Sequence, residues 1–205
     1  MSGKFIVFEG IDGSGKSSQI RMLAEKLRAD GRKVYITAEP TESTSGGMLR
    51  DALSGVVRRT ATEMAALFTL DRVNHNVNPV NGIKKMLSDG FDVICDRYYY
   101  STLAYQGSEI RGDWAFDANL NCPEIRHPDV CIFLDVSPDV GLERIGKGDR
   151  GFTEIYEKRE TLMAVRKKYF DAFSALSTTD NIEIINADRD FESIADDVFR
   201  AVAKL

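Results

Sequence analysis

The sequence of 205 residues contains little of what disulfide-bonded and metal-binding proteins depend on. Its three cysteines, Cys95, Cys122 and Cys131, show no CxxC spacing, and Cys95 and Cys131 lie in apolar runs. Such cysteines are typical of buried, reduced thiols, so we expect neither a disulfide framework nor a cysteine metal site. The two histidines, His75 and His127, are too few and too scattered to indicate zinc.

Long apolar runs and a surplus of basic residues are also missing. No apolar run approaches the roughly 20 residues of a membrane-spanning helix, and the N-terminus lacks the apolar core of a signal peptide. The formal net charge of −5 argues against a nucleic-acid-binding surface. We therefore expect a cytoplasmic protein without membrane or nucleic-acid partners. The length suits one domain over residues 1–205, and neither repeats nor linkers interrupt it.

Short apolar runs alternate with stretches of helical spacing along the chain. The expected strands are residues 5–8, 33–37, 92–95, 130–136 and 182–185, and most of them are continuously apolar. The expected helices are residues 23–28, 62–78, 154–176 and 191–204, the last capped by Asp190. Two stretches, 42–47 and 146–151, are expected to be mobile. This alternation predicts a three-layer α/β fold with a five-stranded parallel sheet, and ligands at the carboxyl ends of its strands.

A complete GxxxxGK[ST] phosphate loop, GIDGSGKS, occupies residues 10–17, between an apolar strand and a helical stretch. Glycines let successive backbone N–H groups point at one anion, and the following helix adds positive charge at its N-terminus. In this motif Lys16 reaches the β- and γ-phosphates and the Ser17 hydroxyl binds Mg²⁺. The sequence therefore predicts that a nucleoside triphosphate, with Mg²⁺, binds at Gly10, Ile11, Asp12, Gly13, Ser14, Gly15, Lys16, Ser17 and Ser18.

The loop alone leaves GTPases, motor ATPases, transport ATPases and nucleotide kinases open. No NKxD-type guanine signature is evident, and the chain is short for a motor core. Asp96 and Arg97 directly follow an expected strand, where a carboxylate can reach Mg²⁺ and a guanidinium can span two phosphates. The segment GKGDRG at 146–151 reads as a basic lid carrying Lys147 and Arg150. Together these features favour a kinase of small substrates.

Several segments resemble the thymidylate kinases, which phosphorylate dTMP to dTDP with ATP, and the likeness is greatest to archaeal-type members. The family's patterns appear as FEGIDGSGKS at 8–17, Glu39-Pro40, FTLDR at 68–72 and DRYYYSTLAYQ at 96–106. PD at 128–129 and LDV at 134–136 precede the lid, so the resemblance runs from about residue 4 to about residue 190. The DRYYYSTLAYQ segment is its specific part, because other phosphate-loop kinases lack it.

The resemblance implies a role for each matching residue. Phe68 stacks on thymine, Arg72 donates to a thymine carbonyl, and Arg97 holds the phosphates. Asp12 accepts from the sugar 3′-hydroxyl, and Tyr105 crowds the 2′ position. Glu39, Pro40, Arg50, Ser101, Thr102 and Gln106 complete the monophosphate pocket, Arg144 lies near ATP, and Asp96 joins Ser17 at the metal. Each of these residues could instead have a purely structural role. Phe68 and Tyr105 would then be core aromatics, Arg72 a surface partner of Asp71, and Asp96–Arg97 a surface ion pair.

The match departs from the family at two places. Many relatives have arginine where this chain has Ala38, and Arg50 is the expected substitute. Some eukaryotic relatives carry an arginine where this chain has Gly13. We therefore expect Lys147 or Arg150 to supply the transition-state cation. Both residues belong to the lid, which is expected at about residues 145–153. The family commonly dimerises through helices, which the apolar residues of 62–78 permit. A kinase of another monophosphate such as dUMP, or a nucleotide-binding switch, remains the alternative function.

Overall fold

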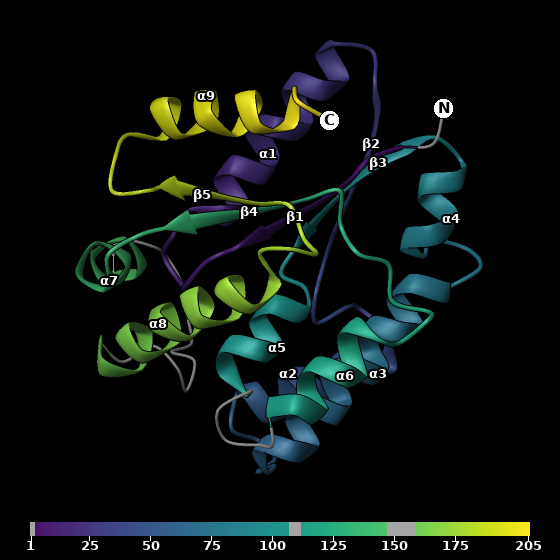
Figure 1. The fold of residues 1–205 in the computed structure, drawn as a ribbon, viewed down its shortest axis with the longest axis vertical. Helices are drawn as coiled ribbons and strands as arrows, with labels where there is room; N and C mark the ends of the chain where they lie inside the picture. The colour runs from purple at the N-terminus through teal and green to yellow at the C-terminus, as the bar shows by residue number, and fades with distance from the viewer. Residues whose placement is uncertain (1–2, 107–111, 147–158) are drawn as a thin grey trace.

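A computed structural model describes residues 3–106, 112–146 and 159–205, with the backbone alone at 112 and 113. Five strands form one sheet in the order β2-β3-β1-β4-β5, and every neighbouring pair is parallel (Figure 1). The strands are β1 (Phe5–Glu9), β2 (Lys33–Ala38), β3 (Phe91–Asp96), β4 (Val130–Asp135) and β5 (Ile182–Asn186). The predicted α/β fold is confirmed, and each strand end agrees with its prediction to within one residue.

The burial of the strands explains why their sequences differ. All five residues of β1, at the centre of the sheet, are buried, and β4 is nearly so. Since both faces of a central parallel strand are covered, such strands are continuously apolar. The edge strands instead expose apolar side chains, with Ile36 of β2 and Ile184 of β5 about half exposed.

Helices cover both faces of the sheet. In Figure 1, α1 (Lys16–Ala29) and α9 (Phe191–Val202) lie on one face, and α5 (Tyr99–Tyr105) and α8 (Arg159–Leu176) on the other. The others within the described residues are α2 (Thr44–Leu53), α3 (Ala61–Val77), α4 (Ile83–Ser88), α6 (Gly112–Leu120) and α7 (Pro138–Gly146). No helix in the described ranges has the length and apolar character needed to cross a membrane.

Two helix predictions and one loop prediction need correction. The first helix begins at Lys16 rather than residue 23, because the phosphate loop opens directly into it. Residues 44–47, expected to be mobile, form the start of α2, which Ser43 caps by accepting a hydrogen bond from the Gly46 N–H. The last helix begins at Phe191 with the predicted Asp190 cap but ends at Val202. Of the helix expected at 154–176, residues 159–176 are helical and 154–158 lie outside the described residues.

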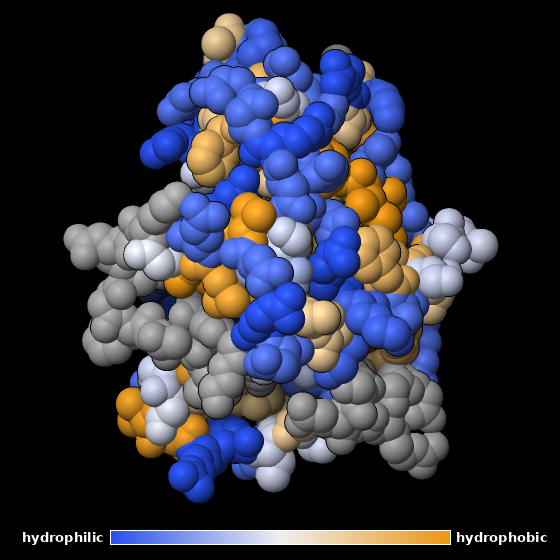
Figure 2. Space-filling model, turned by 90° about the vertical axis from the view of Figure 1, so that its left-hand side faces the viewer, coloured by the Kyte–Doolittle hydropathy of each residue, from blue (hydrophilic) through white to orange (hydrophobic). Residues whose placement is uncertain are grey.

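The topology brings two functional segments to one edge of the sheet. The phosphate loop follows β1. Asp96 ends the neighbouring strand β3, where it pairs with Phe8, and Arg97 follows directly. Figure 2 views the molecule from the side toward which the arrows of β4 and β5 point in Figure 1. Hydrophilic residues predominate on this side, and apolar residues form separate patches rather than one continuous area. Charged ligands are therefore expected at this edge.

Candidate active site

The phosphate loop has the backbone geometry of an anion-binding turn. Gly13 and Gly15 have φ angles of 77° and 92°, in the left-handed region that glycine adopts without steric cost. Gly15 is the N-cap of α1 and supplies no side-chain hydrogen bond, so the first N–H groups of the helix are left for a ligand. The buried Ser14 hydroxyl oxygen also has no partner among the described residues. The predicted loop residues, Gly10, Ile11, Asp12, Gly13, Ser14, Gly15, Lys16, Ser17 and Ser18, thus lie together at the start of α1.

Lys16 is folded back into the loop. Its Nζ donates to the carbonyl oxygens of Gly10, at 3.0 Å, and Ile11, at 3.3 Å. Burial lowers the pKa of this ammonium, and the positive charge of Arg97 lowers it further. An anionic ligand on the loop would oppose both effects, so the site is electrostatically prepared for phosphate.

Arg97 crosses from the end of β3 to the phosphate loop. Its Nη2 lies 2.5 Å from Asp12 Oδ1, and its Nη1 lies 3.4 Å from the Gly10 carbonyl oxygen. The backbone of Arg97 has a φ of 68°, which is uncommon for a residue other than glycine. Such angles cluster at functional sites. The alternative that Asp96 and Arg97 form a surface ion pair is wrong, because Arg97 pairs with Asp12 instead.

Two oxygen ligands suited to Mg²⁺ lie at the same edge. Asp96 Oδ1 is buried and has no hydrogen-bond partner among the described residues. Ser17, in the first turn of α1, is exposed. Magnesium in phosphoryl-transfer sites is held by one or two protein ligands together with substrate phosphates, so this donor set fits the ion.

Glu9 is a buried residue beside the predicted site that the sequence reasoning missed. This buried carboxylate accepts from the Tyr98 N–H at 2.8 Å, from the Ser101 hydroxyl at 2.7 Å and from the Tyr169 hydroxyl at 2.8 Å. Burial raises its pKa, and the positive charge of Arg97 opposes that rise. Glu9 therefore joins β1 to the segment that carries Arg97 and to α8. The signal in the sequence was a carboxylate at the end of an apolar strand.

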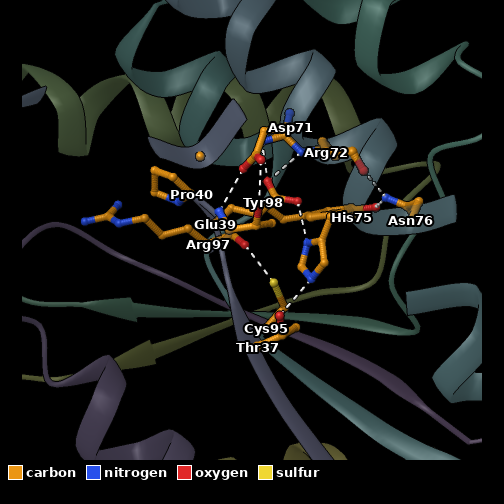
Figure 3. A network of polar contacts seen from close by, with 12 residues as sticks. Thr37, Glu39, Pro40, Asp71, Arg72, His75, Asn76, Cys95, Arg97 and Tyr98 are labelled. Carbon is orange, nitrogen blue, oxygen red and sulfur yellow. Dashed lines mark hydrogen bonds and ion pairs between the residues drawn. The ribbon is translucent and has the colours of Figure 1, made fainter. Parts of the chain in front are cut away.

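Glu39, directly after β2, and Arg72 of α3 form a buried ion pair. Arg72 Nε and Nη2 lie 2.9 and 2.7 Å from Glu39 Oε2, and both side chains are almost completely buried. In Figure 3, Glu39 lies between Arg72 and His75, whereas the guanidinium of Arg97 extends away from them. The alternative that Arg72 is a surface partner of Asp71 is wrong, because Arg72 is buried and pairs with Glu39. Asp71 accepts instead from the N–H and hydroxyl of Thr41.

The other predicted acceptor-site residues surround this pair. Thr102 Oγ1 lies 3.3 Å from Arg72 Nη2, and Gln106 is buried with Oε1 unpartnered within the described residues. The Tyr105 ring centroid lies 5.6 Å from the Arg97 guanidinium carbon. Arg50 donates to the Thr41 carbonyl oxygen at 2.6 Å and to that of Pro40 at 3.4 Å. Arg50 therefore lies next to the Glu39-Pro40 segment, and its substitute role stays a prediction.

Phe68 lies outside the main hydrophobic core. It packs against a small separate cluster formed by Leu49, Ala52 and Met64 of α2 and α3 and remains partly exposed. Phe68 is therefore not a residue of the main core around the sheet, and the alternative that it is a core aromatic is wrong in that sense. Tyr105, in contrast, does belong to the main core cluster, at its edge beside Arg97.

An aromatic ring that the sequence reasoning missed, Phe191, lies beside the phosphate loop. Its centroid is 5.3 Å from the Arg144 guanidinium carbon, and a Cβ atom added to Gly15 would lie 3.1 Å from its ring. Gln19 of α1 holds the Phe191 carbonyl oxygen at 2.8 Å. Arg144 therefore lies over a ring that borders the loop, and its role at ATP stays a prediction. Lys147 and Arg150 lie outside the described residues.

Comparisons with known proteins agree on one family. The family model described as thymidylate kinase matches residues 8–198. A protein of Methanococcus aeolicus named "Probable thymidylate kinase" is 43% identical over 169 residues, covering 82% of this chain and 78% of its own length. Thymidylate kinases of Ruegeria pomeroyi and Desulfotalea psychrophila are 39% and 36% identical and cover 98% and 99% of this chain and 95% and 96% of their own lengths. The chain therefore belongs to the thymidylate kinase family.

Proposed function

We propose that this protein transfers the γ-phosphoryl group of ATP to dTMP, giving dTDP and ADP. Membership of the thymidylate kinase family supports this reaction. The observation that carries it is the Arg97–Asp12 ion pair, which joins the acceptor-side segment after β3 to the phosphate loop after β1. A kinase must bring two anionic nucleotides into line, and this pair lies where their phosphates meet.

On the donor side, the loop amides and Lys16 bind the β- and γ-phosphates of ATP. The Lys16 ammonium exchanges its two carbonyl contacts for phosphate oxygens, which neutralises charge on the transferred group. Arg144 and Phe191 bind the adenine end. Ser17 and Asp96 would hold Mg²⁺, and the ion would neutralise part of the negative charge of the phosphates.

On the acceptor side, Arg97 binds the phosphate of dTMP, and Asp12 orients its guanidinium. Phe68 stacks on thymine, which a flat apolar ring stabilises by about 1 kcal/mol beyond burial. Arg72 and Thr102 meet the base carbonyl edge. Tyr105 lies beside the deoxyribose, and Gln106 offers its unpartnered oxygen to the substrate. Arg50 takes the place of the arginine that Ala38 replaces.

A cation from the segment after α7 completes the transition state. Gly13 leaves the phosphate loop without an arginine of its own, so Arg150 or Lys147 neutralises the charge that develops on the transferred phosphoryl group. One domain with this lid, a homodimer and a cytoplasmic location all stay predictions.

A coupled assay of ADP release across a panel of nucleoside monophosphates tests the function. The panel contains dTMP, dUMP, dCMP, dAMP and dGMP, each with ATP and Mg²⁺. We expect the highest kcat/KM with dTMP. A folded protein that releases no ADP above background with any of them, or that prefers another monophosphate to dTMP, contradicts the proposal.

A further inference from the structure

A buried histidine, His75, lies behind the arginine of the acceptor pocket. Its side chain is 5% exposed, and both ring nitrogens have partners. Nδ1 lies 3.0 Å from Glu39 Oε1, and Nε2 lies 2.8 Å from Thr37 Oγ1 (Figure 3). Because a carboxylate only accepts, Nδ1 donates to Glu39, and Nε2 can then accept from the Thr37 hydroxyl. The ring is thereby fixed in one orientation between β2 and α3.

The carboxylate of Glu39 passes this constraint to Arg72. Its Oε1 binds His75, and its Oε2 binds Arg72 Nε at 2.9 Å and Nη2 at 2.7 Å. A buried carboxylate is held by its partners, because each of them compensates part of its lost hydration. With one oxygen on each partner, the plane of the carboxylate is set from both sides.

The opposite edge of the Arg72 guanidinium points toward α5 and α6. Nη1 donates to Asn119 Oδ1 at 2.5 Å, and Nη1 and Nη2 lie 3.4 and 3.3 Å from Thr102 Oγ1. The guanidinium is planar, so fixing its Nε edge on Glu39 also fixes the direction of this far edge. Among the described residues, the two contacts to Thr102 are the longest hydrogen bonds of Arg72. That edge is therefore the part most easily shared with a carbonyl oxygen of a ligand.

We propose that His75 is a positioning residue for the pyrimidine ring of dTMP. Through Glu39 it holds the Arg72 guanidinium in the plane that meets a base carbonyl, and it does not itself touch the substrate. This inference rests on the proposed function. A purely structural His75 would instead contribute to folding alone, and its loss would not weaken dTMP selectively.

The test compares His75→Ala and His75→Asn with His127→Ala. His127 is a matched control, because its Nδ1 also lies 2.9 Å from a buried carboxylate, Asp180, but in a separate network with Tyr99 and Tyr100. We expect His75→Ala to raise the KM for dTMP about tenfold, as the loss of one buried hydrogen bond would. The KM for ATP should stay within about twofold of the wild-type value, because the substitution weakens only the binding of the acceptor dTMP. In His75→Asn the short amide can still donate to Glu39. The KM for dTMP should therefore be close to the wild-type value and well below that of His75→Ala. His127→Ala should lower only the thermal midpoint.

A second measurement does not depend on turnover. In the wild-type protein the Nε–H of Arg72 is buried against Glu39 and should give a slowly exchanging signal in ¹⁵N NMR spectra, assigned by its loss in Arg72→Lys. His75→Ala should shift this signal and speed its exchange. An unchanged Nε–H signal in His75→Ala, or an unchanged KM for dTMP with a lowered thermal midpoint, overturns the proposal. Should the wild-type protein fail to phosphorylate dTMP, the proposed function is wrong, and the Nε–H signal still decides whether His75 holds Arg72.

Discussion

Gly13 of the phosphate loop and Gly141 of α7 are packed backbone against backbone. A Cβ atom added to Gly13 would lie 2.1 Å from the Gly141 carbonyl oxygen, and one added to Gly141 would lie 2.8 Å from the Asp12 carbonyl oxygen. Neither backbone can give way as a flexible side chain would. The contact therefore requires glycine in this loop at position 13, because α7 occupies the space that a side chain would need.

This contact predicts that Gly13→Ala disables the phosphate loop. The substitution adds a clash with backbone to the strain of a left-handed φ, which alone costs about 1–2 kcal/mol. Gly31→Ala is the matched control, because Gly31 has a φ of 80° but no atom within 4 Å of an added Cβ. We expect Gly13→Ala to lower both the thermal midpoint and ATP affinity by clearly more than the control does. Equal effects of the two substitutions in thermal melts and ATP titrations would show that the contact with Gly141 is unimportant.

Lys16→Ala should remove activity and leave the fold intact. The lysine neutralises charge on the transferred phosphoryl group, and such contacts are worth on the order of a hundredfold or more in kcat. Steady-state kinetics and circular dichroism of the purified variant measure both effects. Lys26→Ala, on the same helix but with a half-exposed side chain, is the control and should be near wild type. Normal turnover of a folded Lys16→Ala variant would rule out the phosphate-loop mechanism.

The fold could be predicted closely because its signals are local. The central strand β1 is continuously apolar and fully buried, and the loop after it has fixed spacing. The start of α2 was mispredicted since Ser, Thr and Gly at 43–47 indicate a loop. Asp71, 26 residues or more further on, accepts hydrogen bonds from Thr41 and Ser45 and orders this turn. That contact is not visible in the local sequence.

The site was predicted less completely because its partners are distant in the chain. Residue types and the family pattern predicted that Arg97 and Arg72 would be functional. They could not give their partners, since Asp12 lies 85 positions from Arg97 and Glu39 lies 33 from Arg72. Glu9 shows the same limit, because one of its donors, Tyr169, is 160 residues away. Pairings of this kind follow from the order of strands in the sheet.

Phe68→Ala should weaken dTMP and spare ATP. The ring lies in a small cluster apart from the sheet core, so its loss should leave the main fold intact. Stacking acts in the ground and transition states alike, so the KM for dTMP should rise by about tenfold with little change in kcat. Phe68→Leu keeps apolar bulk without a flat ring and should recover only part of the affinity. If the KM for ATP rises as much as that for dTMP, Phe68 has a structural role instead.

The transition-state cation gives the sharpest prediction. Since α7 excludes an arginine at position 13, Arg150 or Lys147 should supply a charge that acts only while the phosphoryl group is in transfer. Arg150→Ala should therefore lower kcat on the order of a hundredfold or more and leave the KM of each substrate within a few-fold. Lys147→Ala and the double variant decide which of the two residues acts, and Lys167→Ala on α8, where the side chain is largely exposed, is the control. Near-wild-type kcat in the double variant would assign the whole of this charge to Arg97 and Lys16.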